Sequence, residues 1–250
     1  MYFDSHAHYD DEEFDTDRDY LLKNLGDVDC IINCGADLDS SKKSIALAQK
    51  YNFISAAVGI HPENVENLNE DDISKLEWLA KHEKVKAIGE IGLDFHYENY
   101  SRDKQIYWFE KQIQLANKLN LPIIIHSRDA ANDTLEIVKS HAKTNGVVHC
   151  FGASTQIALD YINLGFFIGI GGVITFKNGK KLVEVVENIP LENILIETDC
   201  PYLSPEPNRG KRNNSSNLKF IAQKIAQIKN IPHDTVAHIT FENAKRLFRI

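Results

Sequence analysis

The sequence has little of what marks membrane, secreted or disulfide-stapled proteins. No apolar run approaches the roughly 18–20 residues that a membrane span needs. The four cysteines include no Cys-x-x-Cys pair, so no disulfide framework is expected and we interpret them as buried small residues. The N-terminal segment has neither the basic nor the apolar region of a signal peptide. We therefore expect a cytoplasmic protein without membrane contact.

An excess of positive charge is also missing, because the net charge is −8. This excludes a protein that coats nucleic acid through a broad basic surface. The net charge is still compatible with an enzyme that binds nucleic acid locally, since bound divalent cations can supply positive charge at the site. The 250 residues, 43% of them hydrophobic, suffice for one large domain or two small ones. Because no linker or low-complexity tract interrupts the chain, we expect a single domain over residues 1–250 and a monomer.

Short β-branched apolar runs alternate with helical patterns along the whole chain. Between two of the runs, Ile106, Phe109 and Ile113 recur at helical spacing. Asp103 and Asn132 are predicted helix starts. Eight runs are predicted as strands: Tyr2–Asp4, Cys30–Asn33, Ile54–Val58, Ala87–Glu90, Ile123–His126, Val147–His149, Phe166–Ile170 and Ile194–Glu197.

Eight strand-helix units in a chain of this length favour a (β/α)8 TIM barrel. A doubly wound open sheet is the alternative, and it is disfavoured because no Gly-x-Gly-x-x-Gly follows the first run. The late cluster Gly169-Ile170-Gly171-Gly172 lacks the ending of a phosphate-binding loop. It indicates close packing at a strand end instead.

The residues that carry chemistry lie where the predicted strands end. His6 and His8 are one residue apart, so in an extended strand both side chains point to the same face. Two imidazoles on one side of a strand end can bind one metal ion. Further His or carboxylate groups end other runs: His61, Glu90, His126, His149 and Asp199. In a barrel the C-terminal strand ends form the active site, so these groups are expected to converge.

The set His6, His8, His126, His149, Glu90 and Asp199 exceeds what one catalytic ion needs. An ion takes three or four protein ligands and keeps an open position for water, so six ligands suit two ions. Glu90 is the natural bridge because a carboxylate has two oxygens. Two ions about 3.5–4 Å apart can generate a hydroxide and stabilise the attacking and leaving oxygens. Mixed nitrogen and oxygen ligation suits zinc, manganese or iron better than an all-oxygen magnesium site.

Several motifs together resemble the TatD family of metal-dependent deoxyribonucleases, within the amidohydrolase-like metal barrels. The resemblance runs in order from residue 1 to residue 250. One departure is mild: Cys200 stands where the family often has alanine. The matching segments are Asp4-Ser5-His6-Ala7-His8, Gly59-Ile60-His61-Pro62, Gly89-Glu90-Ile91-Gly92-Leu93-Asp94, Pro122 to Arg128, His149-Cys150-Phe151, Glu197 to Leu203, Asn208 to Asn213 and Phe241-Glu242-Asn243-Ala244.

The resemblance implies a role for each candidate residue. His6 and His8 would hold one divalent ion with Glu90 and Asp199, and Glu90, His126 and His149 would hold the second. Asp199 would also orient or deprotonate the attacking water. His61 would contact the scissile phosphate. Arg209 and Lys211 would meet the nucleic-acid backbone, although this run is equally compatible with a solvated loop.

The activity implied is hydrolysis of DNA phosphodiesters by a two-metal activated water, with single strands cleaved from a 3′ end. The two divalent ions would be Mg, Mn or Zn. The same site could instead act as a D-aminoacyl-tRNA deacylase or on a small amide or lactone. Phosphotriesterase-like and urease-like enzymes of the wider superfamily bridge their metals with a carboxylated lysine. The glutamate here favours phosphodiester hydrolysis of the TatD type over amide hydrolysis. A folded barrel that only binds a partner is disfavoured, because every expected ligand is present.

Overall fold

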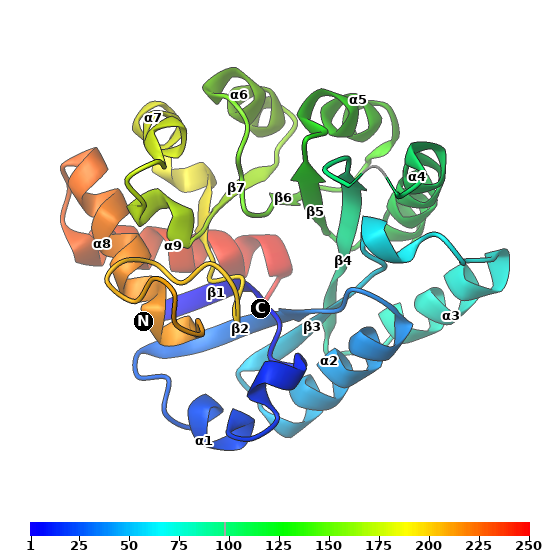
Figure 1. Ribbon diagram of the computed structural model, residues 1–250, viewed down its shortest axis with the longest axis horizontal. Helices are drawn as coiled ribbons and strands as arrows, with labels where there is room; N and C mark the ends of the chain where they lie inside the picture. The colour runs from blue at the N-terminus through cyan, green and yellow to red at the C-terminus, as the bar shows by residue number, and fades with distance from the viewer. Residues whose placement is uncertain (98) are drawn as a thin grey trace.

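Eight parallel strands form one sheet in which each strand pairs with the next along the chain (Figure 1). The structure is a computed structural model and describes residues 1–97 and 99–250. A bridge between Ala7 and Cys200 joins the ends of β1 and β8, so the sheet is nearly closed. The predicted (β/α)8 barrel is confirmed.

The strands are short and almost wholly buried, as expected for a parallel sheet that is covered on its outer face. Their bounds are β1 (Tyr2–Ala7), β2 (Val28–Cys34), β3 (Ile54–Val58), β4 (Val85–Asp94), β5 (Ile123–Arg128), β6 (Gly146–Val148), β7 (Phe167–Ile170) and β8 (Ile194–Ile196).

Helices connect the strands and surround the barrel. Side-chain caps start several of them: the Asp37 carboxylate accepts from the Ser40 amide at the start of α2, and Ser101 caps α4. The bounds are α1 (Arg18–Leu22), α2 (Leu38–Lys50), α3 (Glu70–Ala80), α4 (Arg102–Leu119), α5 (Ala131–His141), α6 (Thr155–Asn163), α7 (Lys180–Asn188), α8 (Leu218–Lys229) and α9 (His233–Phe248).

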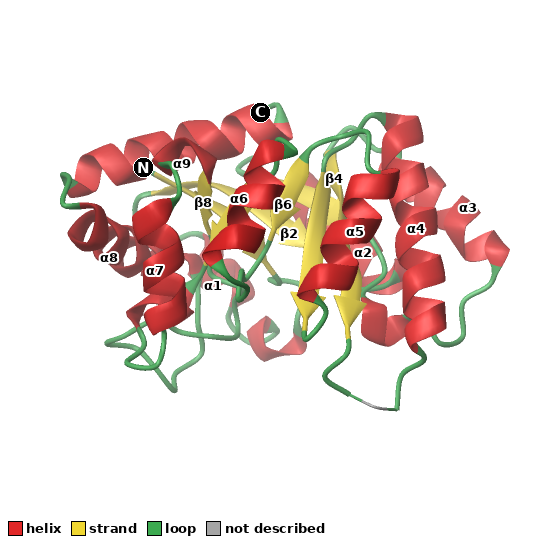
Figure 2. Cartoon of the chain, turned by 90° about the horizontal axis from the view of Figure 1, so that it is seen from above, coloured by secondary structure: helices red, strands yellow, loops and turns green. Residues whose placement is uncertain are grey.

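The barrel interior is filled from one end by small and apolar side chains. Each strand contributes to one buried cluster, and Leu247 and Phe248 of α9 pack against it. Figure 2 shows α9 lying across the end of the barrel opposite the strand arrowheads. The strand residues of this cluster are Phe3, Ile32, Cys34, Ala57, Ala87, Ile124, Val147, Phe167 and Leu195. Because this end is closed by packing, a polar site has room only at the C-terminal strand ends.

Several predicted boundaries were wrong. β4 continues four residues past Glu90, so this carboxylate lies inside a strand and not at its end. The pairing of β4 with β5 is irregular between Ile88 and Ile91, so simple alternation does not locate Glu90. Helix α4 starts just before the predicted Asp103, because Ser101 supplies the cap. Helix α5 also starts one residue before Asn132, at Ala131.

The interpretation of the late glycines as close packing fits the structure. A Cβ at Gly169 would lie 2.6 Å from the Glu197 carboxylate, and one at Gly172 would lie 2.1 Å from the Leu203 carbonyl oxygen.

Among the described residues, none of the helices has the length and apolarity required to cross a membrane.

Candidate metal centre

The two N-terminal histidines converge as the strand alternation predicts. His6 belongs to β1 and His8 follows it, and their Nε2 atoms lie 2.9 Å apart. The His6 Nε2 is 3.3 Å from Glu90 Oε2 and 3.7 Å from Asp199 Oδ1. The His8 Nε2 is 3.7 Å and 3.5 Å from the same two oxygens. Four residues from β1, β4 and the loop after β8 thus form one group of ligand atoms.

A second group meets the other oxygen of Glu90. The Oε1 atom lies 2.8 Å from His126 Nδ1 and 2.6 Å from His149 Nε2. His61, at the end of β3, brings its Nε2 to 3.8 Å of the same oxygen. The two carboxylate oxygens of Glu90 therefore face two different sets of histidines.

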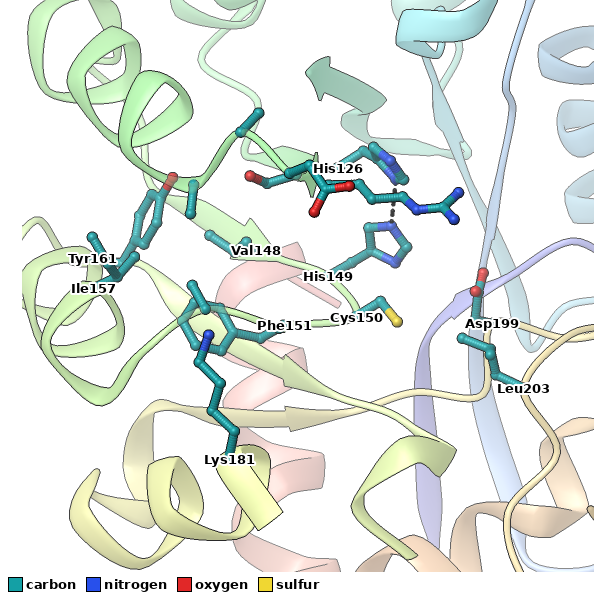
Figure 3. Close-up of a pocket in the computed structure, with 17 residues that line it drawn as sticks. His126, Val148, His149, Cys150, Phe151, Ile157, Tyr161, Lys181, Asp199 and Leu203 are labelled. Atoms are coloured by element: carbon teal, nitrogen blue, oxygen red, sulfur yellow. Dashed lines mark hydrogen bonds between the residues drawn. The ribbon is translucent and has the colours of Figure 1, made fainter. Parts of the chain in front are cut away.

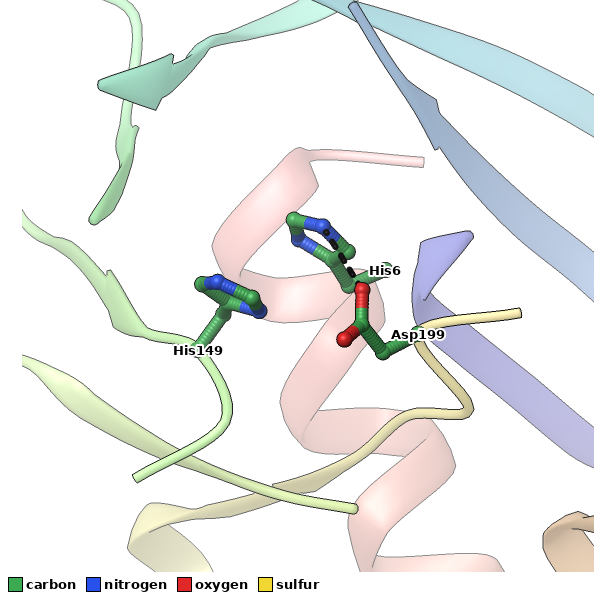
Figure 4. Close-up of side chains that lie close together, drawn as sticks. All are labelled: His6, His149 and Asp199. Carbon is green, nitrogen blue, oxygen red and sulfur yellow. Dashed lines mark ion pairs between the residues drawn. The ribbon is translucent and has the colours of Figure 1, made fainter. Parts of the chain in front are cut away.

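The two groups are in contact with each other. The rings of His6 and His149 are stacked, with centroids 3.9 Å apart and planes 12° apart. Figure 4 shows these two rings and the Asp199 carboxylate turned toward one another, from three different elements. His6 is fully buried and His149 is 5% exposed. All seven candidate residues with His or carboxylate side chains thus cluster at the barrel mouth, where His6, Glu90 and His149 are buried and the other four are partly buried.

Hydrogen bonds on the outer side orient two of the imidazoles. The Nδ1 of His8 is 2.9 Å from the Cys34 carbonyl oxygen, which leaves Nε2 to face Glu90 and Asp199. The Nε2 of His126 is 2.9 Å from Asp94 Oδ2, which leaves Nδ1 to face Glu90. Partners of this kind set the tautomer of metal-binding histidines and increase their basicity.

Two further contacts complete this outer layer. The Nδ1 of His149 lies 3.7 Å from Glu197 Oε1, and Glu197 is fully buried. Burial raises the pKa of Glu197 to about 7. The Nδ1 of His6 lies 3.4 Å from the Cys34 sulfur. The inner nitrogen of each ring, Nε2 in both cases, therefore points to the carboxylates.

The carboxylates and the imidazoles stabilise one another's charge. Burial alone would raise the pKa of Glu90, but His149, His6 and His126 outweigh it and hold that pKa well below its usual range. Burial lowers the pKa of His8, but Asp199 and Glu90 outweigh it and raise that pKa to about 10. The buried carboxylates therefore require compensating positive charge.

Two other histidines stay neutral. Burial lowers the pKa of His6 and of His61, in each case to about 4. Burial also lowers the pKa of His126, but hydrogen bonds to Asp94 and Glu90 outweigh burial and raise this pKa to about 9. Neutral imidazole nitrogen beside carboxylate oxygen is the donor mixture that zinc, manganese and iron favour.

Three sets of side chains within the described residues have ligand atoms close enough to hold an ion. These atoms lie within 4.8 Å of one another in each set. The donors fit a divalent cation, because carboxylate oxygens and imidazole nitrogens, the ligand atoms that such ions take, converge in each set. The sets are His6, His149 and Asp199; His6, His8 and Glu90; and His61, Glu90 and His126.

The predicted nucleic-acid contacts do not join this cluster. Arg209 is exposed and its guanidinium lies 4.3 Å from the centroid of the Phe176 ring. Lys211 is also exposed, and its carbonyl accepts a hydrogen bond from Ser204. Their role in substrate binding therefore stays a prediction.

Asp94 and Glu197 belong to the sequence motifs, but we predicted no role for them at the site. Each lies beside a candidate ligand, and the signal was available, since a carboxylate in a buried apolar run needs a partner.

The interpretation of the cysteines was wrong for two of the four. Cys34 and Cys200 are buried, whereas Cys30 and Cys150 are partly exposed.

The barrel and the cluster at its mouth define the class of the protein as a metal-dependent hydrolase. A profile of the family described as TatD related DNase matches residues 3–249. The chain belongs to this family.

Known proteins agree with this assignment. The chain is 43% identical over 254 residues to an uncharacterized metal-dependent hydrolase, YabD, of Bacillus subtilis, and the alignment covers 100% of both chains. It is 34% identical to the uncharacterized metal-dependent hydrolase YcfH of Escherichia coli, over 99% of this chain and 95% of YcfH. The crystal structure of YjjV, a TatD homologue from E. coli, superposes with a TM-score of 0.93 at 30% identity, covering 100% of this chain and 98% of YjjV.

Proposed function

We propose that the protein is a deoxyribonuclease that hydrolyses phosphodiesters of single-stranded DNA from the 3′ end, as a monomer. One observation carries the proposal: the two oxygens of Glu90 face two separate sets of imidazoles. A bridging carboxylate between two ligand sets suits a pair of divalent ions, the arrangement used for phosphodiester cleavage. The name of the matching family supports DNA as the substrate.

The family resemblance implies how these ligands would divide between two ions. His6, His8, Glu90 and Asp199 would hold one ion, and Glu90, His126 and His149 would hold the other. Divalent ions such as Mg, Mn or Zn, when bound there, supply Lewis-acid activation of water and of the phosphoryl oxygens.

The remaining chemistry belongs to side chains. Burial acts to raise the pKa of Asp199, but its hydrogen bond with His8 outweighs this and lowers it, so Asp199 is an ionised carboxylate that can orient water and accept its proton. His61 lies within reach of the same centre through Glu90 and, being neutral, can donate a hydrogen bond to the scissile phosphate.

The proposal is tested with purified protein, end-labelled single-stranded DNA and added Mg²⁺, Mn²⁺ or Zn²⁺. Elemental analysis of the same preparation measures bound metal. The matched substrates are an RNA strand and a D-aminoacyl-tRNA, which test the other esters that this site could cleave. Stepwise shortening of DNA from its 3′ end supports the proposal. Hydrolysis of the aminoacyl ester with no cleavage of DNA would contradict it.

Variants assign the activity to this centre. Loss of a residue that only hydrogen bonds to a metal ligand lowers activity by up to roughly 100-fold. Glu90→Gln and His126→Ala change proposed ligands themselves, so each should lower the cleavage rate by more than this. His82→Ala is the control, because His82 hydrogen bonds to Gln49 on the surface. Activity that survives both site substitutions would show that another part of the chain carries it.

A further inference from the structure

A large hollow adjoins the metal centre on one side of the barrel mouth. It has a volume of about 650 Å³, and His126, His149 and Asp199 form its inner wall. We call it the α6 hollow. Figure 3 shows it opening between the loops after β5 and β6 and the helices α6 and α7. Its outer walls include Arg128, Phe151, Ile157, Tyr161, Lys181 and Leu203.

The walls of the α6 hollow are apolar with two cations at the edge. Phe151 and Tyr161 are almost fully buried, and Ile157 is partly buried beside them. Within the described residues the Tyr161 hydroxyl is buried without a hydrogen-bond partner, so the wall holds a polar group that no neighbour uses. An apolar pocket of this size with few polar groups is typical of sites for flat organic groups such as a nucleobase.

The cations at the edge are available to a substrate. Lys181 is exposed and forms no ion pair with the described residues, and Figure 3 shows it extending from α7 toward the loop after β6. Arg128 approaches Asp94 only at 4.0 Å and also lies over the Tyr97 ring. Of the carboxylates on this side, Asp129 is paired with His96 and Asp199 belongs to the metal centre.

The opposite side of the centre is lined by more carboxylates than the α6 side. A second hollow of about 630 Å³, which we call the β1–β3 hollow, also reaches His8, His61 and Glu90, and shares Arg128. Additional carboxylates line it: Asp10, Asp11, Asp37, Glu63 and Asp94. A polyanion is repelled there and attracted on the α6 side.

From these observations we infer that the DNA strand beyond the scissile phosphate runs across the α6 hollow. The base next to that phosphate occupies the apolar pocket, and the next phosphate along the strand pairs with Lys181. In the bound substrate, the terminal nucleoside on the other side of the scissile phosphate lies toward the acidic β1–β3 hollow. It carries no phosphate besides the scissile one. This inference rests on the proposed nuclease function and adds which side of the site takes the strand.

The test varies substrate length and one charge. A dinucleotide contains only the scissile phosphate, whereas a trinucleotide adds the phosphate that reaches Lys181. Lys181→Ala should therefore raise KM about threefold to fivefold for the trinucleotide and longer strands, and leave KM for the dinucleotide unchanged. Lys180→Ala is the matched control, because this neighbouring lysine is exposed and does not line the hollow.

A second variant tests the base pocket. Ile157→Trp fills the hollow, so it should raise KM about tenfold or more for dinucleotides and trinucleotides alike, with bound metal unchanged. If wild-type protein cleaves oligonucleotides but both variants match the Lys180→Ala control at every length, the inference is wrong and the nuclease function stands. If wild-type protein cleaves no oligonucleotide yet hydrolyses methyl p-nitrophenyl phosphate, the proposed function is wrong and the inference falls with it.

Discussion

At the scale of single residues, the centre depends on carboxylates that the ligand list alone does not contain. Asp94 lies within hydrogen-bond distance of the outer nitrogen of His126, and Glu197 lies 3.7 Å from the outer nitrogen of His149. A metal-binding imidazole that lacks such a partner can rotate or change tautomer, so its inner nitrogen is no longer held in place. The ligands and their outer partners therefore act as one unit.

Asp94→Asn tests this dependence at His126. The amide keeps the shape of the carboxylate but removes the charge that faces the His126 Nε2, so metal affinity should fall about 10- to 100-fold. Titration with Zn²⁺ or Mn²⁺ and elemental analysis measure the change. Asp129→Asn is the control, because its pair with His96 is exposed. Equal affinity in both variants would show that Asp94 does not support the centre.

At the scale of secondary-structure elements, backbone approach in β7 matters as much as any ligand. Gly169 of β7 lies directly against the Glu197 side chain and the His149 backbone. Only a residue without a Cβ leaves this space, since a Cβ there would lie 2.6 Å from the nearest carboxylate oxygen. The glycine thus keeps β7, β8 and the loop after β6 at the spacing that the centre needs.

Gly169→Ala should destabilise the fold by about 1–3 kcal/mol and weaken metal binding, because Glu197 or His149 must move. Gly171→Ala is a matched control in the same segment, since its Cβ would meet nothing closer than 3.8 Å. Urea unfolding followed by circular dichroism measures both variants. Two equal free energies of unfolding would show that the close approach at Gly169 is relaxed in solution.

Helices α3 and α4 are joined by an ion pair that is sensitive to pH. The Glu77 carboxylate lies 2.7 Å from the Lys118 ammonium and 2.8 Å from that of Lys81. Lys118, followed by Lys81, lowers the pKa of Glu77 from 4.5 to about 2. Since the folded pKa is the lower one, this contribution to stability is present above pH 4.5 and is lost as pH falls toward 2.

Glu77→Gln should therefore be slightly less stable than the wild-type protein near pH 7, because the pair is at the surface. The difference in free energy of unfolding should shrink as pH falls from 4.5 toward 2. Urea titrations at several pH values measure it, with Glu83→Gln as a control that removes one nearby charge. A difference that stays constant down to pH 3 would contradict the ion-pair explanation.

At the scale of the whole molecule, charge limits how much nucleic acid the protein can hold. The net charge of −8 leaves no surface for wrapping a strand. Under the proposed function, attraction comes from the barrel mouth, where Lys181 and Arg128 border one side of the centre. The protein should therefore bind a few nucleotides and not a long segment.

This predicts a weak salt dependence of DNA cleavage. Two or three phosphate contacts correspond to a slope of about 1.5–2 for log KM against log salt concentration with single strands. Kinetics in KCl from low to physiological concentration measure it, and methyl p-nitrophenyl phosphate, with its single charge, should give a slope near zero. A slope above about 5 would indicate a broad basic footprint and contradict the confined site.

The repeat of apolar runs and the chemistry at their ends were sufficient to predict the barrel and which His and carboxylate residues come together at its mouth. Local periodicity carries this information, because burial of each strand and the alternation in β1 are properties of neighbouring residues. The strand bounds were less certain: Glu90 lies inside β4, since the pairing with β5 is irregular there.

Three-dimensional packing alone settled how the residues are used. Glu90 presents one oxygen to His6 and the other to His149, and Asp94 and Glu197 lie behind two imidazoles. One side of the mouth also carries more carboxylates than the other. These are relations between distant segments. They depend on distances across the barrel, which closure of the sheet creates and no local pattern encodes.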